Sequence, residues 1–446
     1  MEATTDPDRG SGAERDARIR QLSRDHVLTS WVAQKAISPV PLAGGEGAWF
    51  WDYEGTRYLD FTSQLVYANL GYQHPTLTEA IREAATGLTT IAPAFASESR
   101  AEAAAAIAEL APEGLSKVFF TNAGAEANEN AVRMARLHTG RQKVLATYRS
   151  YHGATAGAIA LTGEPRRWGS EPSVPGVVHF WGPYLYRSEF SASTEQEEGE
   201  RALAHLRHTV EAEGPHLIAA IVLETVVGSN GILVPPPGYL EGVRALCDEH
   251  GIMLILDEVM SGFGRTGAWF ALDHWGVRPD LIVFAKGVNS GYVPLGGVIL
   301  SEEIAATFDE RPYPGGLTYS GHPLATASAL AAIQIMREEA LNQHVVELGE
   351  RTLGPTLHTL GDRHEIVGDV RGLGAFWAVE LVADRESRTP LPAQKMAAVT
   401  KACTNRGMWP LVMGNRVHMV PPCVISHEDA ARGVEILDEA LEEVGA

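Results

Sequence analysis

The chain has 446 residues, of which 45% are hydrophobic and 21% are charged, so it is long enough for two or three domains of an ordinary globular protein. Its formal net charge of −20 argues against a nucleic-acid partner, because proteins that bind a phosphate backbone usually carry a basic face. The acidic balance favours solubility and indicates no particular substrate.

Cysteine content and hydropathy argue against a disulfide-rich, cysteine-ligated metal or membrane-spanning protein. Three cysteines without a CxxC pair indicate neither a disulfide framework nor a metal site, and they favour a reducing, cytoplasmic location. The sequence has no run of about eighteen apolar residues, so we expect no membrane-spanning helix and no membrane partner. Residues 1–25 are polar, lack the apolar core of a signal peptide and are predicted to be a flexible tail.

The next segment, residues 26–75, carries the first strand signal. The stretch GAWFWDYEGTRYLDF (47–61) alternates aromatic and polar residues around Glu54-Gly55, which predicts a β-hairpin. We expect this N-terminal segment to join a small domain formed by the C-terminal part of the chain.

Residues 76–335 are predicted to form a large α/β domain. Short apolar runs alternate there with segments of helical spacing, such as AEANENAVRMARLHTG and PGYLEGVRALCDEHG, which each close on glycine. The near-continuous Val, Ile and Leu content of the runs favours a mostly parallel sheet covered on both faces. The predicted strands are 117–121, 143–148, 218–224, 252–258, 281–287 and 296–301.

Residues 336–446 change character again. EEALNQHVVELGERTLGPTLHTL has helical spacing, GAFWAVELV reads as a strand, and EDAARGVEILDEALEEV as a terminal amphipathic helix. This pattern predicts a smaller α+β domain.

Residues that directly follow the strands are the candidate ligand-binding residues, because ligands of open α/β sheets bind outside the carboxyl ends of the strands. After 117–121 comes Gly124 at the start of a helix, which is either a phosphate cradle or simply a capped helix. After 143–148 come Tyr151-His152-Gly153, which either cover a planar ring or form a turn with a packed tyrosine.

Carboxylates and a lysine follow the later strands. Glu224 and Asp257 each end an apolar run, where a charge is costly unless a positive group meets it. Asp257 would pair with an arginine or with a protonated ring nitrogen. Lys286 interrupts DLIVFAKGVNSG, and its amine either reaches solvent or is kept dry as a nucleophile toward carbonyls.

Taken together, these groups match the requirements of one cofactor. Pyridoxal 5'-phosphate requires a phosphate anchor, a ring stack, an acid for the pyridine nitrogen and an amine for a Schiff base. All four are predicted at one edge of the sheet.

From about Trp31 to the C-terminus the chain resembles class III aminotransferases, which are pyridoxal-phosphate enzymes. The motifs that carry the resemblance are FFTNAGAEANENAVRMAR, YRSYHGAT, LDEVMSGFGRTG, FAKGVNSGYVPLGGV and GLTYSGHPLA. The resemblance implies fold type I: a mostly parallel, seven-stranded sheet in a large domain, with a smaller α+β domain. It also implies a homodimer with shared active sites.

Roles transfer by resemblance to individual positions. Lys286 would form the Schiff base and then move the substrate proton, while Asp257 would keep the ring nitrogen protonated. Arg265 is expected to be structural. Further cofactor-binding positions are Gly124 and Ala125 for the phosphate, Tyr151 and Val259 for the two ring faces, His152, Glu224, and Thr318 reaching over from the neighbouring subunit.

The sequence departs from many relatives in the substrate region. Met260 stands where ornithine- and GABA-type members have glutamine, which is more like pyruvate- or taurine-type ω-aminotransferases. His418 stands where many relatives place the arginine that binds the substrate carboxylate. Arg416, two residues earlier on the same strand face, is either the clamp for the acid group or a surface cation. Arg371 is a weaker candidate, and His418 itself is a candidate substrate contact. The resemblance adds a pocket wall of Trp31, Gln64, Leu65, Val66, Tyr67 and Phe95.

The expected activity is a ping-pong transfer of an amino group from an ω-amino acid or taurine-like amine to pyruvate or 2-oxoglutarate. An aminomutase, decarboxylase or racemase is the alternative within the fold, because the same lysine and acid serve all of them. A dinucleotide-binding dehydrogenase would need a GxGxxG after the first strand, which is absent from the sequence. A non-catalytic binding protein would not need Lys286 and Asp257.

Overall fold

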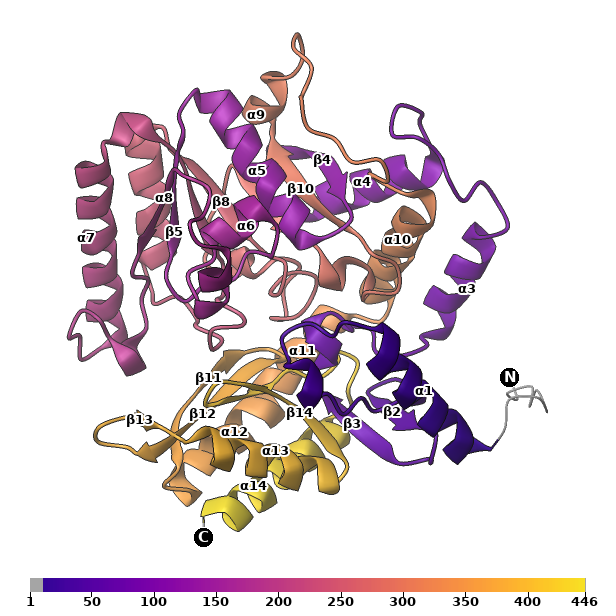
Figure 1. Ribbon diagram of the computed structural model, residues 1–446. Coiled ribbons are helices and arrows are strands. Elements are labelled where there is room, and N and C mark those ends of the chain that lie inside the picture. Colours follow the sequence, from indigo (N-terminus) through magenta and orange to yellow (C-terminus); the bar gives the residue numbers. More distant parts are fainter. Residues whose placement is uncertain (1–10, 446) are drawn as a thin grey trace.

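The computed structural model describes residues 11–445 as two β-sheets with helices around them (Figure 1). The larger sheet has seven strands, and the pairs among β5 to β9 are parallel, while β10 runs antiparallel to both β4 and β9. Its spatial order is β4 (Leu115–Thr121), β10 (Gly296–Ser301), β9 (Leu281–Phe284), β8 (Met253–Asp257), β7 (Ile218–Glu224), β5 (Lys143–Thr147) and β6 (Val177–Phe180).

Both faces of this sheet are covered, since β7 and β9 bury every residue and β8 buries every residue except Met253, which is partly buried. Alternate side chains of a strand point to opposite faces. Val222 and Ile255 pack with α5 on one face, while Ile221 and Leu254 join the larger core on the other. The helices around the sheet are α3 (Pro75–Ala84), α4 (Glu98–Leu110), α5 (Gly124–Thr139), α6 (Ala156–Leu161), α7 (Glu195–Glu213), α8 (Tyr239–His250), α9 (Glu302–Ala306) and α10 (Pro323–Glu338).

The second sheet joins the two ends of the chain. Strand β3 pairs in parallel with β14, so the hairpin at residues 49–61 lies beside the C-terminal strands, as the indigo and yellow ribbons of Figure 1 show. Its strands are β1 (Leu42–Glu46), β2 (Trp49–Asp52), β3 (Arg57–Phe61), β14 (Met408–Met413), β15 (Arg416–Met419), β12 (Phe376–Asp384) and β11 (Val367–Leu373), with β13 (Thr389–Pro390) on β12.

The remaining helices pack around the second sheet or connect it to the first. They are α2 (Ser63–Val66), α11 (Leu341–Leu348), α12 (Gly354–Arg363), α13 (Ala393–Asn405) and α14 (His427–Gly445). Gly433 of α14 faces Phe61 of β3 so closely that a Cβ would lie 2.0 Å from the ring, which shows how tightly the two chain ends pack.

The N-terminal region differs from the expected flexible tail. Residues Gly12–His26 form helix α1, whereas residues 1–10 lie outside the described part of the chain. Ser11 and Glu14 make a reciprocal capping box, and Arg20 pairs with Asp16 one turn away. Arg15 lies over the ring of Tyr53 at 4.7 Å, which ties the helix to the body of the protein. Helix α1 has too few apolar residues for the sequence pattern to predict it.

Candidate active site

The carboxyl ends of β4, β5, β7, β8 and β9 surround a cavity of about 390 Å³. The cavity is where the strand-end residues meet, as the topology of an open α/β sheet requires. Of the predicted cofactor-binding residues, eight line it: Gly124, Ala125, Tyr151, His152, Glu224, Asp257, Val259 and Lys286.

Lys286 enters the cavity from a short 3-10 turn, Lys286–Asn289, that follows β9. Its backbone is left-handed, with φ 48°, a conformation that non-glycine residues adopt at an energetic cost and that is common at functional sites. Burial lowers the pKa of Lys286 to about 8, although Asp257 and Glu224 act in the opposite direction. The amine is therefore much closer to its neutral, nucleophilic form at pH 7 than an ordinary lysine is.

Asp257 is the last residue of β8 and is 4% exposed. Its Oδ2 accepts hydrogen bonds from Asn128 Nδ2 and pairs with His152 Nδ1, both at 2.8 Å, and its Oδ1 accepts the Val259 N–H at 3.0 Å. Burial alone would lower the pKa of His152, but the hydrogen bond and charge of Asp257 raise it above 6.5. A carboxylate held by these three donors keeps lone pairs for one more donor from the cavity.

Glu224 ends the neighbouring strand β7 and holds two loops in place. Its Oε1 accepts the Tyr151 N–H and its Oε2 accepts the Gly228 N–H, each at 2.8 Å. Burial raises the pKa of Glu224 to about 7. The side chain thus positions Tyr151 over the cavity and brings the loop after β7 to its edge.

The start of helix α5 forms an anion cradle. The first N–H groups of a helix, here those of Gly124 and Ala125, have no helical acceptor and lie at its positive end. A Cβ at Gly124 would lie 2.9 Å from Val259, so only glycine lets the backbone approach the cavity this closely. Gly153, at φ 135°, packs against Ala125 of this cradle.

The cavity walls suit a flat aromatic ligand. Tyr151 and Val259 both line it, as do Tyr67 and Met260. Together with the cradle, the free side of Asp257 and the amine of Lys286, these walls match the phosphate, ring faces, ring nitrogen and aldehyde of pyridoxal 5'-phosphate. Asn128 was not anticipated from the sequence, although its position one helical turn after Gly124 places it on the same face.

Other predicted residues lie away from this cavity. Trp31, Leu65, Phe95 and Thr318 are exposed, and Val66 is buried with a positive φ of 59°. The Gln64 side chain contacts the hydroxyl of Tyr72 instead. The roles assigned to these residues stay predictions.

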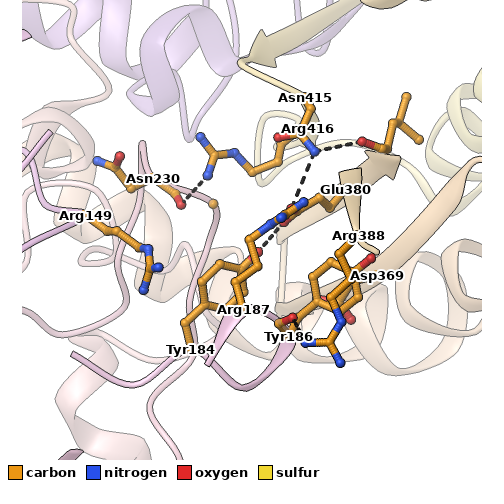
Figure 2. Close-up of polar contacts among 12 residues, drawn as sticks. Arg149, Tyr184, Tyr186, Arg187, Asn230, Asp369, Glu380, Arg388, Asn415 and Arg416 are labelled. Carbon is orange, nitrogen blue, oxygen red and sulfur yellow. Dashed lines mark hydrogen bonds and ion pairs between the residues drawn. The ribbon is translucent and has the colours of Figure 1, made fainter. Parts of the chain in front are cut away.

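Arg416 is engaged by the protein itself. Its Nη1 donates to the Asn230 carbonyl at 2.8 Å and its Nε to that of Met413 at 3.2 Å, as Figure 2 shows for Asn230. Arg371 similarly bonds to Gly231 O, Asp369 and Glu380.

Two further residues of this region are buried. Arg265 is fully buried and donates to the carbonyls of Ala375 and Pro421, in keeping with the expected structural role. Burial lowers the pKa of His418 to about 3, so the ring is neutral. A neutral histidine supplies no charge for an acid group.

Comparison with known proteins supports the cofactor site that the geometry indicates. The sequence pattern of aminotransferase class-III matches residues 32–441. A taurine–pyruvate aminotransferase from Rhodobacter capsulatus is 34% identical over 446 residues, covering 94% of this chain and 95% of the relative. A putrescine–pyruvate aminotransferase from Pseudomonas aeruginosa is 33% identical, covering 95% and 96%.

Solved structures extend the likeness to three dimensions. The taurine:2-oxoglutarate aminotransferase from Bifidobacterium kashiwanohense, in complex with pyridoxal phosphate and glutamate, superposes with a TM-score of 0.93 at 39% identity, covering 96% of this chain and 98% of that one. The predicted family, fold type I, and cofactor are thereby confirmed. The chain belongs to the class III aminotransferases, enzymes that depend on pyridoxal 5'-phosphate.

Proposed function

We propose that this enzyme moves the amino group of an ω-amino acid or taurine-like donor to pyruvate or 2-oxoglutarate in a ping-pong reaction. The observation that carries the proposal is the meeting of Lys286, Asp257 and the α5 cradle in one cavity. Relatives that bear taurine–pyruvate and taurine:2-oxoglutarate names support the donor and acceptor classes.

Each residue of the cavity has a distinct task in this proposal. Bound pyridoxal phosphate supplies the carbonyl group that captures the amine and the ring that draws electrons from the reacting carbon. Gly124 and Ala125 would hold its phosphate through backbone N–H groups, Tyr151 and Val259 would cover its ring, and Asp257 would face its ring nitrogen.

Lys286 carries the covalent attachment and the proton transfer. Its neutral amine would hold the cofactor covalently, and Nζ, once released, would accept the proton from the carbon that bears the donor's amino group. A pKa of about 8 suits both tasks, because the group gains and loses a proton near the working pH. His152 keeps Asp257 paired throughout.

A reaction with donor alone tests the function. Mixed with β-alanine or taurine and no acceptor, the holoenzyme should lose its yellow colour and release a single equivalent of carbonyl product per site. Added pyruvate should restore the colour. An aminomutase, decarboxylase or racemase returns to the starting spectrum by itself, so an unchanged final spectrum would reject amino transfer.

We further propose that the working unit is a homodimer with shared sites. Exposed apolar side chains cluster in sequence near the N-terminus and before α4, which supports a covered surface there: Leu28, Trp31, Leu65, Leu88 and Phe95. Thr318 is exposed and stays away from its own chain's cavity, as a residue serving a neighbour would. Sedimentation equilibrium should give twice the single-chain mass. A monomer that is fully active would contradict this.

The proposed location is the cytoplasm. All three cysteines are buried and unpaired, as is usual in a reducing compartment. Within residues 11–445, no helix combines the length and apolar character needed to cross a membrane. Fractionation of the source cells tests the proposal, and recovery in a secreted fraction would reject it.

A further inference from the structure

The loop of residues 227–233, which follows β7 and is called the β7 loop below, is closed, buried and strained. Val227 and Leu233 bridge its two ends through backbone hydrogen bonds of 3.1 and 3.0 Å. Residues 228–232 between them are buried. Ile232 has φ 54°, a left-handed conformation that is an outlier for a β-branched side chain. Such strain persists only where surrounding contacts impose it, so the β7 loop must be held from outside.

One side of the β7 loop contacts the cavity wall. The Gly228 N–H donates to Glu224 Oε2 at 2.8 Å, and the other oxygen of Glu224 accepts the Tyr151 N–H at the same distance. A Cβ at Gly228 would lie 2.3 Å from Met260 Sδ, so the loop packs directly against that side chain. Glu224, Tyr151 and Met260 all line the cavity. A shift of the β7 loop would therefore move three groups of the cavity wall.

The other side of the β7 loop is held by two arginines of the second sheet. Arg371 Nε, on β11, donates to the Gly231 carbonyl at 2.7 Å. Arg416 Nη1, on β15, donates to the Asn230 carbonyl at 2.8 Å (Figure 2). Gly231 has φ 126°, and a Cβ there would lie 2.7 Å from Arg371 Nη2, so only glycine admits the guanidinium. An unpaired buried carbonyl is costly, so the two arginines stabilise the loop in this position.

A buried carboxylate anchors this pair of arginines. Glu380 of β12 pairs with Arg371 at 2.9 Å. It also pairs with Arg187 at 2.5 Å and accepts the Tyr184 hydroxyl (Figure 2). Burial alone would raise the pKa of Glu380, but the charge of Arg371 and the hydrogen bonds of Tyr184 and Arg187 lower it to about 2. Burial lowers the pKa of Arg416, and the charge of Glu380 opposes this effect. Glu380 therefore stays charged and keeps the guanidinium groups beside the loop.

Arg416 contacts the backbone only. Both hydrogen bonds that it makes within residues 11–445 go to carbonyls, those of Asn230 and Met413. Neither Arg416 nor Arg371 lines the cavity. A guanidinium suits this task because its donors lie in one rigid plane, so less side-chain freedom is lost for each hydrogen bond formed.

We propose that Arg371 and Arg416 are positioning residues, which hold the β7 loop so that Glu224 and Met260 stay in place in the cavity wall. The inference rests on the proposed function and names residues that lie outside the cavity. A continuous chain of contacts supports it, from the two guanidinium groups through the loop carbonyls and Gly228 to Glu224. The second sheet thereby determines the shape of a site that is built on the larger one.

Arg416→Met tests the proposal, because methionine keeps the apolar stem but cannot donate to the Asn230 carbonyl. With β-alanine and pyruvate, kcat per bound cofactor should fall about 10- to 100-fold, the usual cost of losing a charged hydrogen bond or of misplacing a group by about 1 Å. Hydrogen–deuterium exchange at residues 227–233 should rise at least about tenfold. Arg416→Lys, which keeps a donor, should recover part of both effects.

Two further arginines of Figure 2 provide matched controls. Arg388 donates to the carbonyl of Tyr186 and stacks on its ring at 5.1 Å, so Arg388→Met should leave kcat and exchange unchanged. Arg187 pairs with Glu380 and not with the β7 loop. Arg187→Met should therefore lower Tm, while exchange at residues 227–233 stays within about threefold of the wild type.

Gly231→Ala perturbs the same contact from the side of the loop. The new methyl group would lie 2.7 Å from Arg371 Nη2 and 3.1 Å from Arg416 Cδ, at a φ that strains alanine. If both changes act through one contact, Gly231→Ala/Arg416→Met should lose no more than about threefold beyond the more damaged single variant. Losses that multiply would overturn the proposal. Wild-type exchange in Arg416→Met would overturn it too, as would raised exchange with kcat per bound cofactor unchanged.

A spectroscopic readout separates this inference from the proposed function. The visible circular dichroism of the bound cofactor reports its orientation and should weaken in Arg416→Met but not in Arg388→Met. If the wild type moves no amino group from any donor, the proposed function fails. Exchange at residues 227–233 and the dichroism then still decide whether Arg416 holds the β7 loop and the cavity wall, and unchanged values of both would reject the inference.

Discussion

Replacing Lys286 by alanine should abolish amino transfer. The variant loses both the amine that attaches the cofactor and the base that moves the substrate proton, and base catalysis alone contributes about 10²- to 10⁴-fold. We therefore expect kcat to fall by at least about 10³-fold, with cofactor bound but without the yellow colour of the Schiff base. Steady-state assays with β-alanine and pyruvate, together with absorption spectra, measure both effects.

A second lysine provides the control for this experiment. Lys401 is exposed on α13, far along the chain from the cavity residues, and Lys401→Ala should retain colour and activity. Turnover near the wild-type level in Lys286→Ala would end the covalent mechanism. Lost colour with full activity would show that another group does the chemistry.

Much of this site was visible in the sequence because each of its parts follows a strand. The order of apolar runs placed Asp257 and Lys286 at one sheet edge, since strand ends in an open parallel sheet converge. The structure shortens the last of these strands to Leu281–Phe284, and Lys286 lies in the turn beyond it. What sequence reasoning could not supply was the left-handed backbone at Lys286, which only the surrounding packing imposes.

The features that were missed depend on contacts distant in the sequence or on local capping. Strand β6, Val177–Phe180, is short and only partly buried, so its apolar pattern is weak. Helix α1 is stabilised by a capping box and surface pairs more than by an apolar face. The domain boundaries at residues 25, 75 and 335 stay predictions.

Asp257→Asn should slow the donor half-reaction about 10²- to 10³-fold, the usual cost of removing one preorganised electrostatic group. Asparagine keeps the shape but not the charge that faces the ring nitrogen. The same charge outweighs burial at His152 and raises its pKa above 6.5. Without it burial dominates, so the pKa of His152 should fall below 6.5. Stopped-flow absorbance measures the rate of the donor half-reaction, and NMR titration measures the pKa of His152.

The neighbouring carboxylate is the matched control. Glu258 is fully buried, and it accepts hydrogen bonds from Ser261 at 2.6 Å and from the Leu272 N–H at 2.9 Å. Glu258→Gln should therefore lower Tm while leaving the pKa of His152 above 6.5. A pKa of His152 that stays raised in Asp257→Asn would mean that Glu224, the other carboxylate acting on the ring, supplies the charge. Another group than Asp257 would then have to keep the ring nitrogen protonated. A carboxylate that does not raise the pKa of His152, its own buried partner, cannot hold a proton on a cofactor ring.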